Sequence, residues 1–258
     1  MQFSPFARQI LSFAPIAILS LPLPVAQAQG SGAATVLSQL SAAFSGNQIV
    51  QSVQLSGSAA WYAGSLEDTG TVSLTASTNG SSQMQLSLAA TGQRTETQTG
   101  AGSSATCQWA GANGTTHQVD LGNCWRPALW FLPALSLYPS QLPGYLGIVD
   151  LGSGAVGFSG NTYRHLQGQL NLPGPTGTLL TNVPQRSLTD IGLDPVTLLP
   201  AVIAYSVYPD SGAQVPVAVE VHYSNYQTVN GVQIPFLIQR YVNGSLQLQI
   251  TVSSAQIN

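Results

Sequence analysis

Hydrophobic and polar residues alternate along much of this chain, which indicates β-strands. In residues 71–77, Val72, Leu74 and Ala76 occupy every second position and polar residues fill the positions between them. The same rule holds at residues 50–62, 83–90, 215–223 and 245–253. A period of two places successive side chains on opposite faces, and a sheet with one apolar and one solvated face is typically antiparallel. The pattern therefore predicts a large antiparallel sheet.

Four Asn-Gly dipeptides fall between these strand-like stretches. They occupy residues 79–80, 113–114, 230–231 and 243–244. Asparagine and glycine both tolerate the positive φ angles of a type I′ turn, which is the tight turn that suits a two-residue hairpin. We therefore expect hairpins at these dipeptides.

Residues 33–46 follow a different period. Val36, Leu37, Leu40 and Phe44 fall on one face of a helix, and Gly46 stands where a helix commonly ends. This stretch predicts a short amphipathic helix ahead of the strands.

A long apolar segment interrupts the strand pattern in the middle of the chain. Residues 127–149 contain no charged side chain, and four prolines break them up. A membrane span is conceivable from the length alone, but the prolines disfavour it. We expect a short helix that starts at Pro127, followed by an apolar loop, and a second apolar loop at residues 190–205.

The apolar face of such a sheet needs a covering layer, because burial of apolar area contributes about 25 cal/mol per Å². The sequence offers few helical residues for this purpose. The sheet either closes on itself as a sandwich or barrel, or half-closes around a cavity with residues 126–149 as its lid. In the first case the apolar segment is simply core.

The start of the chain resembles an export signal. Arg8 precedes an apolar stretch, and Ala26–Ala28 offer small residues for cleavage, so residues 1–28 predict a signal peptide; the alternative is a membrane anchor. No cysteine follows the cleavage point before Cys107, so we expect a periplasmic protein without a lipid anchor.

Charge excludes some classes of partner. The chain has no lysine, and five arginines remain against nine acidic residues once Arg8 is removed. Binding to nucleic acid requires clustered positive charge, and so does attraction to anionic membrane surfaces. Neither partner is expected.

Two cysteines, Cys107 and Cys124, suit an oxidising compartment and predict one disulfide; two free thiols are the alternative. The bridge would pin residues 92–125, a polar stretch that predicts a hairpin insertion. Two cysteines with His117 nearby do not make a full metal ligand set, and we expect no cofactor.

The closing residues carry a resemblance to a known family. From Tyr223 the chain reads Y-x-x-Y-x-x-V-N-G-V-x-I-P-F, and it ends on Ile257 and Asn258. This run resembles the last strands of the LolA/LolB-like lipoprotein localisation factors, and residues 193–205 resemble a stretch that precedes those strands. The matching residues are Tyr223, Tyr226, Asn230, Gly231, Ile234, Pro235, Asn243, Gly244, Ile257 and Asn258.

The resemblance implies a single domain over residues 29–258. Its fold class is mainly β (α+β): an unclosed antiparallel β-barrel with a short N-terminal helix and a helical or loop lid over the concave apolar face. The closing strands would form the edge of the open barrel, where Pro235 can sit without a ladder amide. Arg94 is the candidate for the arginine that holds the lid in the carriers.

Family members hold lipoprotein acyl chains, and others bind proteins as stress sensors. The resemblance therefore implies a monomeric carrier or chaperone that binds lipid or an acylated protein non-covalently. The alternative is an envelope interaction or sensor module, with an envelope protein as partner and a cavity filled by its own side chains. The expected cavity and lid residues are Val53, Leu55, Leu74, Met84, Leu86, Leu88, Leu129, Trp130, Phe131, Leu132 and Leu135.

Two polar groups could in principle do acid–base chemistry. Glu220 and His222 share one side of a predicted strand, and residues 163–165 form a Tyr-Arg-His cluster. We interpret the first as a solvated outer face and the second as structural. The sequence lacks a nucleophile elbow, a phosphate loop and metal-ligand spacing, so we do not expect an enzyme.

Overall fold

The computed structural model describes residues 31–119, 121–173, 182–208 and 215–258. The predicted signal peptide, residues 1–28, lies outside these ranges. The described helices are α1 (Ser31–Ser45), α2 (Leu121–Cys124) and α3 (Val183–Ser187), with the 3-10 helices η1 (Gly102–Ser104), η2 (Pro133–Ser136) and η3 (Pro139–Gln141). None of these helices is long and apolar enough to cross a membrane.

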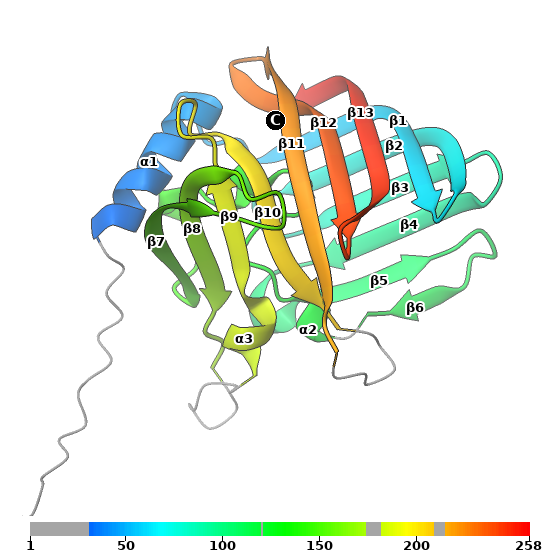
Figure 1. The fold of residues 1–258 in the computed structure, drawn as a ribbon, viewed down its shortest axis with the longest axis horizontal. Coiled ribbons are helices and arrows are strands. Elements are labelled where there is room, and N and C mark those ends of the chain that lie inside the picture. Colours follow the sequence, from blue (N-terminus) through cyan, green and yellow to red (C-terminus); the bar gives the residue numbers. More distant parts are fainter. Residues whose placement is uncertain (1–30, 120, 174–181, 209–214) are drawn as a thin grey trace, which may run out of the picture.

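Thirteen strands of the described residues form one antiparallel sheet (Figure 1). They are β1 (Ser52–Ala63), β2 (Leu66–Ser77), β3 (Ser82–Leu88), β4 (Gly92–Thr99), β5 (Thr106–Ala110), β6 (Thr116–Gln118), β7 (Leu146–Ala155), β8 (Thr162–Leu170), β9 (Thr189–Leu193), β10 (Pro200–Val207), β11 (Val217–Val229), β12 (Val232–Val242) and β13 (Ser245–Ile257). The prediction of a mainly antiparallel, unclosed sheet with one short N-terminal helix is confirmed.

The sheet opens in the middle of the chain. Its strand order is β6-β5-β4-β3-β2-β1-β13-β12-β11-β10-β9-β8-β7, so every strand pairs with its neighbours in sequence except at one point, between β6 and β7. The first and last strands are joined instead, with Val53 opposite Ile257. The chain segment that connects β6 to β7 must therefore cross the opening.

This order corrects the expected place of the closing strands. β11, β12 and β13 lie at the centre of the sheet and not at its edge. Pro235 faces Tyr226 of β11, and the ladder between β12 and β13 starts only at Leu237. The proline is tolerated because its missing amide falls beyond the end of that ladder.

Two of the four Asn-Gly dipeptides form the expected turns. Both residues of 230–231 and of 243–244 have positive φ and join adjacent strands directly. At 79–80 and 113–114 only the glycine has positive φ, and the connections are longer than two residues. Both sites are hairpins as expected, between β2 and β3 and between β5 and β6, but their turns are not the two-residue type I′ turns.

The apolar segment also differs from expectation. No helix starts at Pro127; the helical pieces are η2 and η3, and each begins at a proline. Repeated prolines prevent a longer helix because each removes a backbone donor. Residues 190–205 form strands β9 and β10, and the Asp194 carboxylate accepts hydrogen bonds from the amides of Val196 and Thr197 in the turn between them.

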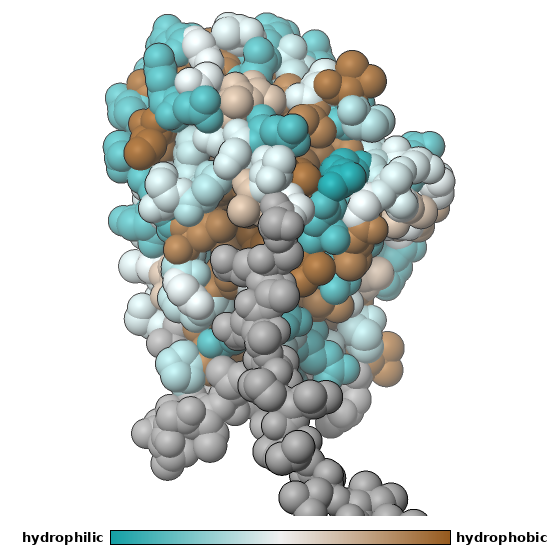
Figure 2. Space-filling view, turned by 90° about the vertical axis from the view of Figure 1, so that its left-hand side faces the viewer, coloured by the Kyte–Doolittle hydropathy of each residue, from teal (hydrophilic) through white to brown (hydrophobic). Residues whose placement is uncertain are grey.

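One hydrophobic core lies on the concave side of the sheet. Helix α1 contributes Leu37, Leu40 and Phe44, all at most 3% exposed, and contacts β7 and β12. The apolar segment packs beside it, where the rings of Phe44 and Tyr138 lie 6.0 Å apart. Figure 2 shows further apolar residues between polar ones on the side of the molecule that carries α1 and β7.

The predicted disulfide is present. It joins Cys107 of β5 to Cys124 at the end of α2, with their Cα atoms 5.7 Å apart. The bridge fixes the edge of the sheet to the start of the apolar segment.

Replacing both cysteines with alanine should lower the free energy of unfolding by about 3 kcal/mol, because the bridge restricts the unfolded chain. Urea denaturation of the two proteins measures the difference. A reducing agent should destabilise the unmodified protein to the same extent and leave the double variant unchanged. Equal stabilities would show that the bridge does not contribute.

Asp68 of β2 fixes the turn between β3 and β4. Its carboxylate accepts hydrogen bonds from the amides of Ala90 (2.9 Å) and Thr91 (2.7 Å) and from the Thr91 hydroxyl (2.7 Å). The Ala90 amide and then the Thr91 hydroxyl are the main causes that lower the pKa of Asp68. A carboxylate whose pKa is lower in the folded state stabilises the fold above its unfolded pKa, and this contribution is lost as the pH falls through the folded pKa.

We therefore expect Asp68→Asn to reduce stability at neutral pH and to matter less as the solution becomes acidic. Urea unfolding of both proteins at a series of pH values from neutral to strongly acidic measures this. A stability difference that stays constant over the series would contradict the assignment.

Candidate functional site

A cavity of about 680 Å³ lies between the concave face of the sheet and the segment that crosses its opening. Strands β3, β4 and β5 form one wall, and β10, β11 and β12 form the facing wall. Residues 123–131 and 135–136 close it on the third side. We call residues 126–145 the lid because they cover this space. The disulfide between Cys107 and Cys124, just before the lid in sequence, also lines the cavity.

Much of the cavity wall is apolar. Met84 comes from β3, Phe131 and Leu135 come from the lid, and Leu146 and Leu170 come from β7 and β8. The opposite wall is a row of valines at the ends of β10, β11 and β12: Val207, Val217, Val219 and Val242. Such a surface stabilises a bound hydrocarbon by removing it from water.

Three arginines and one glutamate share this apolar space. Arg94 and Glu96 come from β4, Arg240 comes from β12, and Arg126 is the first residue of the lid. Glu96 is the acidic residue among the cavity-lining residues, which include neither aspartate nor histidine. The formal charge of the lining side chains is therefore +2 among the described residues.

Glu96 links two of these arginines. Its carboxylate accepts from Arg94 Nε at 3.0 Å and from Arg240 Nη1 at 3.3 Å. Burial by itself would raise the pKa of Glu96, but the charges of Arg240 and Arg94 outweigh it and hold the pKa below its usual value. The carboxylate therefore stays ionised at neutral pH and neutralises one positive charge.

Aromatic rings support the guanidinium groups. Arg94 lies over Trp109 at 4.7 Å from the ring centroid, and Arg240 lies over Trp130 of the lid at 4.9 Å. Both also approach Trp61 of β1. The negative ring faces offset part of the cost of removing the cations from water.

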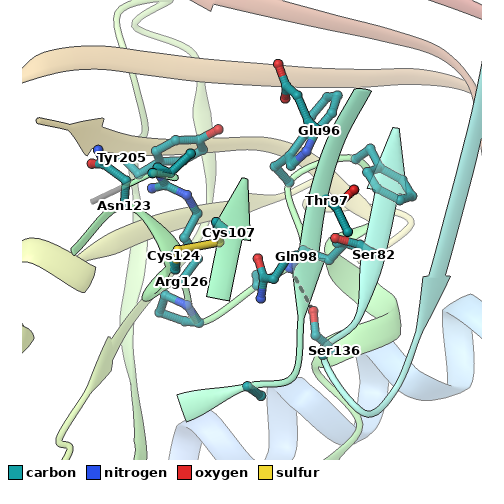
Figure 3. Close-up of a pocket in the computed structure, with 18 of the residues that line it drawn as sticks. Ser82, Glu96, Thr97, Gln98, Cys107, Asn123, Cys124, Arg126, Ser136 and Tyr205 are labelled. Carbon is teal, nitrogen blue, oxygen red and sulfur yellow. Dashed lines mark hydrogen bonds between the residues drawn. A yellow bond between two sulfur atoms is a disulfide. The ribbon is translucent and has the colours of Figure 1, made fainter. Parts of the chain in front are cut away.

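Arg126 stacks on Tyr205 of β10, with its guanidinium carbon 3.9 Å from the ring centroid (Figure 3). No carboxylate of the described residues forms an ion pair with it. Burial lowers the pKa of Arg126, and the charge of Arg240 lowers it further. A guanidinium stays protonated at neutral pH despite such a shift, so Arg126 presents an unneutralised charge to the cavity.

The lid is held by a small number of polar contacts. The Tyr223 hydroxyl donates to the Trp130 carbonyl, and the Tyr138 hydroxyl donates to Ser45 Oγ of α1 at 3.0 Å. Burial raises the pKa of Tyr223 well above its usual value, so its hydroxyl remains a donor. Asn123, just before the lid, exchanges two hydrogen bonds with the backbone of Tyr208 at 2.6 and 2.7 Å.

The structure separates the residues expected to line the cavity into two groups. Those that line it are Met84, Leu129, Trp130, Phe131 and Leu135. Those that pack within the core and do not line it are Val53, Leu55, Leu74, Leu86, Leu88 and Leu132. The second group is buried in the hydrophobic core, with each side chain at most 7% exposed.

The cationic side of the cavity was not predicted from the sequence. Arg94 was expected to hold the lid, but its contacts are with Glu96, Trp61 and Trp109. Arg240 is the arginine that touches the lid, at Trp130. One signal pointed to Arg126, because a charged residue directly precedes 23 uncharged ones. For Arg240 the signal was the period of two in its strand, which places it on the same face as the buried Ile234 and Ile238.

The Glu220–His222 pair is not a solvated outer face as expected. Glu220 is 2% exposed, accepts from the Phe158 amide at 2.7 Å, and lies 2.5 Å from His222 Nε2. The connection between β7 and β8 folds over this part of the sheet and buries the carboxylate. Gly157 allows the approach, since a side chain there would collide with Glu220. We assign this contact a structural role.

Two residues of the Tyr163–His165 cluster make polar contacts with neighbouring strands. Arg164 pairs with Asp150 of β7, and His165 Nε2 lies 2.8 Å from Asp190 of β9. Among the described residues, no group of three or more His, Cys, Asp or Glu side chains could hold a metal ion.

Solved structures of other proteins resemble this fold. No protein-family model matches the sequence, and no curated protein matches it significantly. A DUF1329 family protein from Desulfovibrio piger is 11% identical, with 88% of this chain and 92% of that chain covered and a TM-score of 0.53. A LolA superfamily protein from Nitrosomonas europaea is 12% identical, with 88% and 93% covered and a TM-score of 0.51. The resemblance seen in the closing strands is thus confirmed at the level of architecture: this chain has a LolA-like fold.

Proposed function

We propose that this protein is an exported periplasmic protein that binds a hydrophobic ligand, a lipid or the acyl chains of a lipoprotein, and acts as a carrier or chaperone for it. The observation that carries the proposal is the cavity of about 680 Å³ between sheet and lid. Small-molecule sites in proteins typically measure roughly 300–1,000 Å³ and are lined mainly by apolar and aromatic side chains. The cavity meets both descriptions.

The proposed mechanism is non-covalent. A chain inserted between the valine row of β10–β12 and Phe131 of the lid would lose its contact with water, which contributes about 0.8 kcal/mol for each buried methylene. The lid would move outward for entry and exit. This motion would break the bond from Tyr223 to Trp130 and expose apolar surface of the lid, which includes the buried side chains of Phe131 and Leu135.

Binding is favoured over catalysis because the charged groups among the described lining residues are three guanidiniums and an ionised carboxylate paired with two of them. None of these is poised as a nucleophile or a general acid at neutral pH. We propose that the protein acts as a monomer, with lipid or an acylated protein as its partner.

The rival function is an envelope interaction or sensor module without lipid cargo. Native mass spectrometry of protein exported to a bacterial periplasm distinguishes the two. A co-purified lipid supports the carrier, whereas absence of any lipid together with failure to bind a fluorescent fatty acid would exclude it.

A side chain that fills the cavity should block binding. Val217 lines the cavity at the start of β11, whereas Val215, two residues earlier, is 74% exposed and does not line it. We expect Val217→Trp to weaken binding of a fluorescent fatty acid by about tenfold or more, equivalent to ~1.4 kcal/mol. Val215→Trp is the matched control and should bind normally. Equal affinities in the two variants would place the ligand elsewhere.

Weakening the lid latch should speed ligand exchange. Tyr223→Phe removes the donor to Trp130, and an unpaired buried carbonyl costs about 1–3 kcal/mol. We expect faster amide hydrogen exchange in residues 127–137 and faster release of the fluorescent fatty acid.

Tyr226→Phe is the control for this prediction. Tyr226 also donates to a backbone carbonyl, that of Pro200 at 2.7 Å, but Pro200 belongs to β10 and not to the lid. Its removal should leave exchange in residues 127–137 unchanged. If both variants accelerate release equally, the Tyr223 bond is not a latch.

A further inference from the structure

We propose that the hydrophobic ligand of this cavity carries an anionic head group, a carboxylate or a phosphate ester, and that Arg126 together with Arg240 binds it. The inference rests on the proposed function, since it specifies one end of the molecule whose hydrocarbon part the apolar walls would hold.

Most of the positive charge of the described residues lies in this cavity. The described residues contain five arginines and no lysine, and three of the five line this one space. Seven of the nine acidic residues are described, and one of these, Glu96, lines it. The side chain of Arg240 is only 10% exposed, and burying a cation without enough negative charge beside it is costly.

Glu96 does not neutralise the positive charge of the three arginines. Its carboxylate is bound by Arg94 and Arg240, so one guanidinium of that pair is in excess. Arg126 adds a second unneutralised charge, with the Tyr205 ring as its support. The resulting charge of +2 matches a phosphate monoester, and a single carboxylate would neutralise half of it.

Guanidinium N–H donors without a hydrogen-bond partner also support an anionic head group. Arg240 Nε is buried and has no hydrogen-bond partner. Arg126 makes a backbone hydrogen bond to the Cys124 carbonyl, at 3.0 Å, but no hydrogen bond or ion pair from its guanidinium is present among the described residues. A planar guanidinium fork binds two oxygens of a carboxylate or phosphate at once. These are the donors that such a head group would use.

The apolar residues beside the arginines favour an amphiphilic ligand over a small inorganic anion. Next to the guanidiniums stand the valines of β10–β12 and, across the cavity, Met84, Phe131 and Leu135. A free phosphate would leave these apolar walls exposed to water. A fatty acid or a lipid phosphate would contact both the guanidiniums and the apolar walls. Arg126 is placed by the disulfide that precedes it and by its stack on Tyr205, so the head group site is largely formed before the ligand enters (Figure 3).

The test compares three probes with the same hydrocarbon chain: palmitate, hexadecyl phosphate and hexadecanol. Lipid-free protein, purified after export, is titrated with each by displacement of a neutral fluorescent lipid probe at neutral pH. We expect at least one of the anionic probes to bind about tenfold or more tightly than hexadecanol, as for a charge-assisted hydrogen bond. Whichever anion binds more tightly identifies the head group as carboxylate or phosphate.

Variants assign the preference to a residue. Arg126→Gln should abolish the advantage of the anionic probes and leave hexadecanol binding unchanged, and Arg126→Lys should retain part of the advantage. The control is Arg164→Gln, which removes an arginine that pairs with Asp150 outside the cavity. It should preserve the full preference.

The outcomes separate the two proposals. If all three probes bind equally well to the unmodified protein, the head-group inference is wrong and the proposed function stands. If none of the three binds, both are wrong. If Arg126→Gln retains the preference for an anion, the site assignment is wrong. The comparison on the unmodified protein needs no variant, so misfolding of Arg126→Gln would leave the inference testable.

Discussion

The pairing of β1 with β13 governs the rest of this structure. It joins the first and last of the described strands within one sheet, so the only break among these strands lies between β6 and β7, in the middle of the sequence. The segment that connects these two strands cannot run along an edge; it crosses the concave side. It is therefore the part of the chain that must supply an apolar cover, and residues 127–149, without a single charge, do so.

Covering a curved sheet with an irregular segment has consequences for packing. A regular helix such as α1 fills its part of the concave face completely, with Leu40 and Phe44 each 1% exposed. The lid contains prolines at 127, 133, 139 and 143 and folds into short turns that cannot interdigitate as regularly. The space left on its β4–β5 side is the cavity. Its walls combine lid, sheet and disulfide, so the shape of the cavity depends on the lid position and on the bridge between Cys107 and Cys124.

The distribution of charge gives this cavity its character. In a protein that is mostly uncharged, arginines on a surface would improve solubility, yet Arg94, Arg126 and Arg240 face inward. Tryptophan and tyrosine rings and one shared glutamate make this arrangement tolerable. This inward placement of the three arginines is the basis of the proposed site for an anionic head group.

Local sequence determined much of this protein. Alternation of apolar residues predicted the strands, the 3.6-residue period predicted α1, and the Asn-Gly pairs at 230–231 and 243–244 predicted two tight turns, because each signal depends on neighbours close in the chain. The motif from Tyr223 onward predicted the LolA-like architecture for the same reason.

Tertiary structure alone decided where the sheet opens, since the pairing of β1 with β13 joins the first and last strands, which are far apart in sequence, and no local pattern encodes it. It likewise decided that Glu220 is buried by a distant loop, and that arginines from β4, the lid and β12 meet in one cavity. Their inward direction depends on which face of a curved sheet the lid covers, and that is fixed by packing across the whole chain.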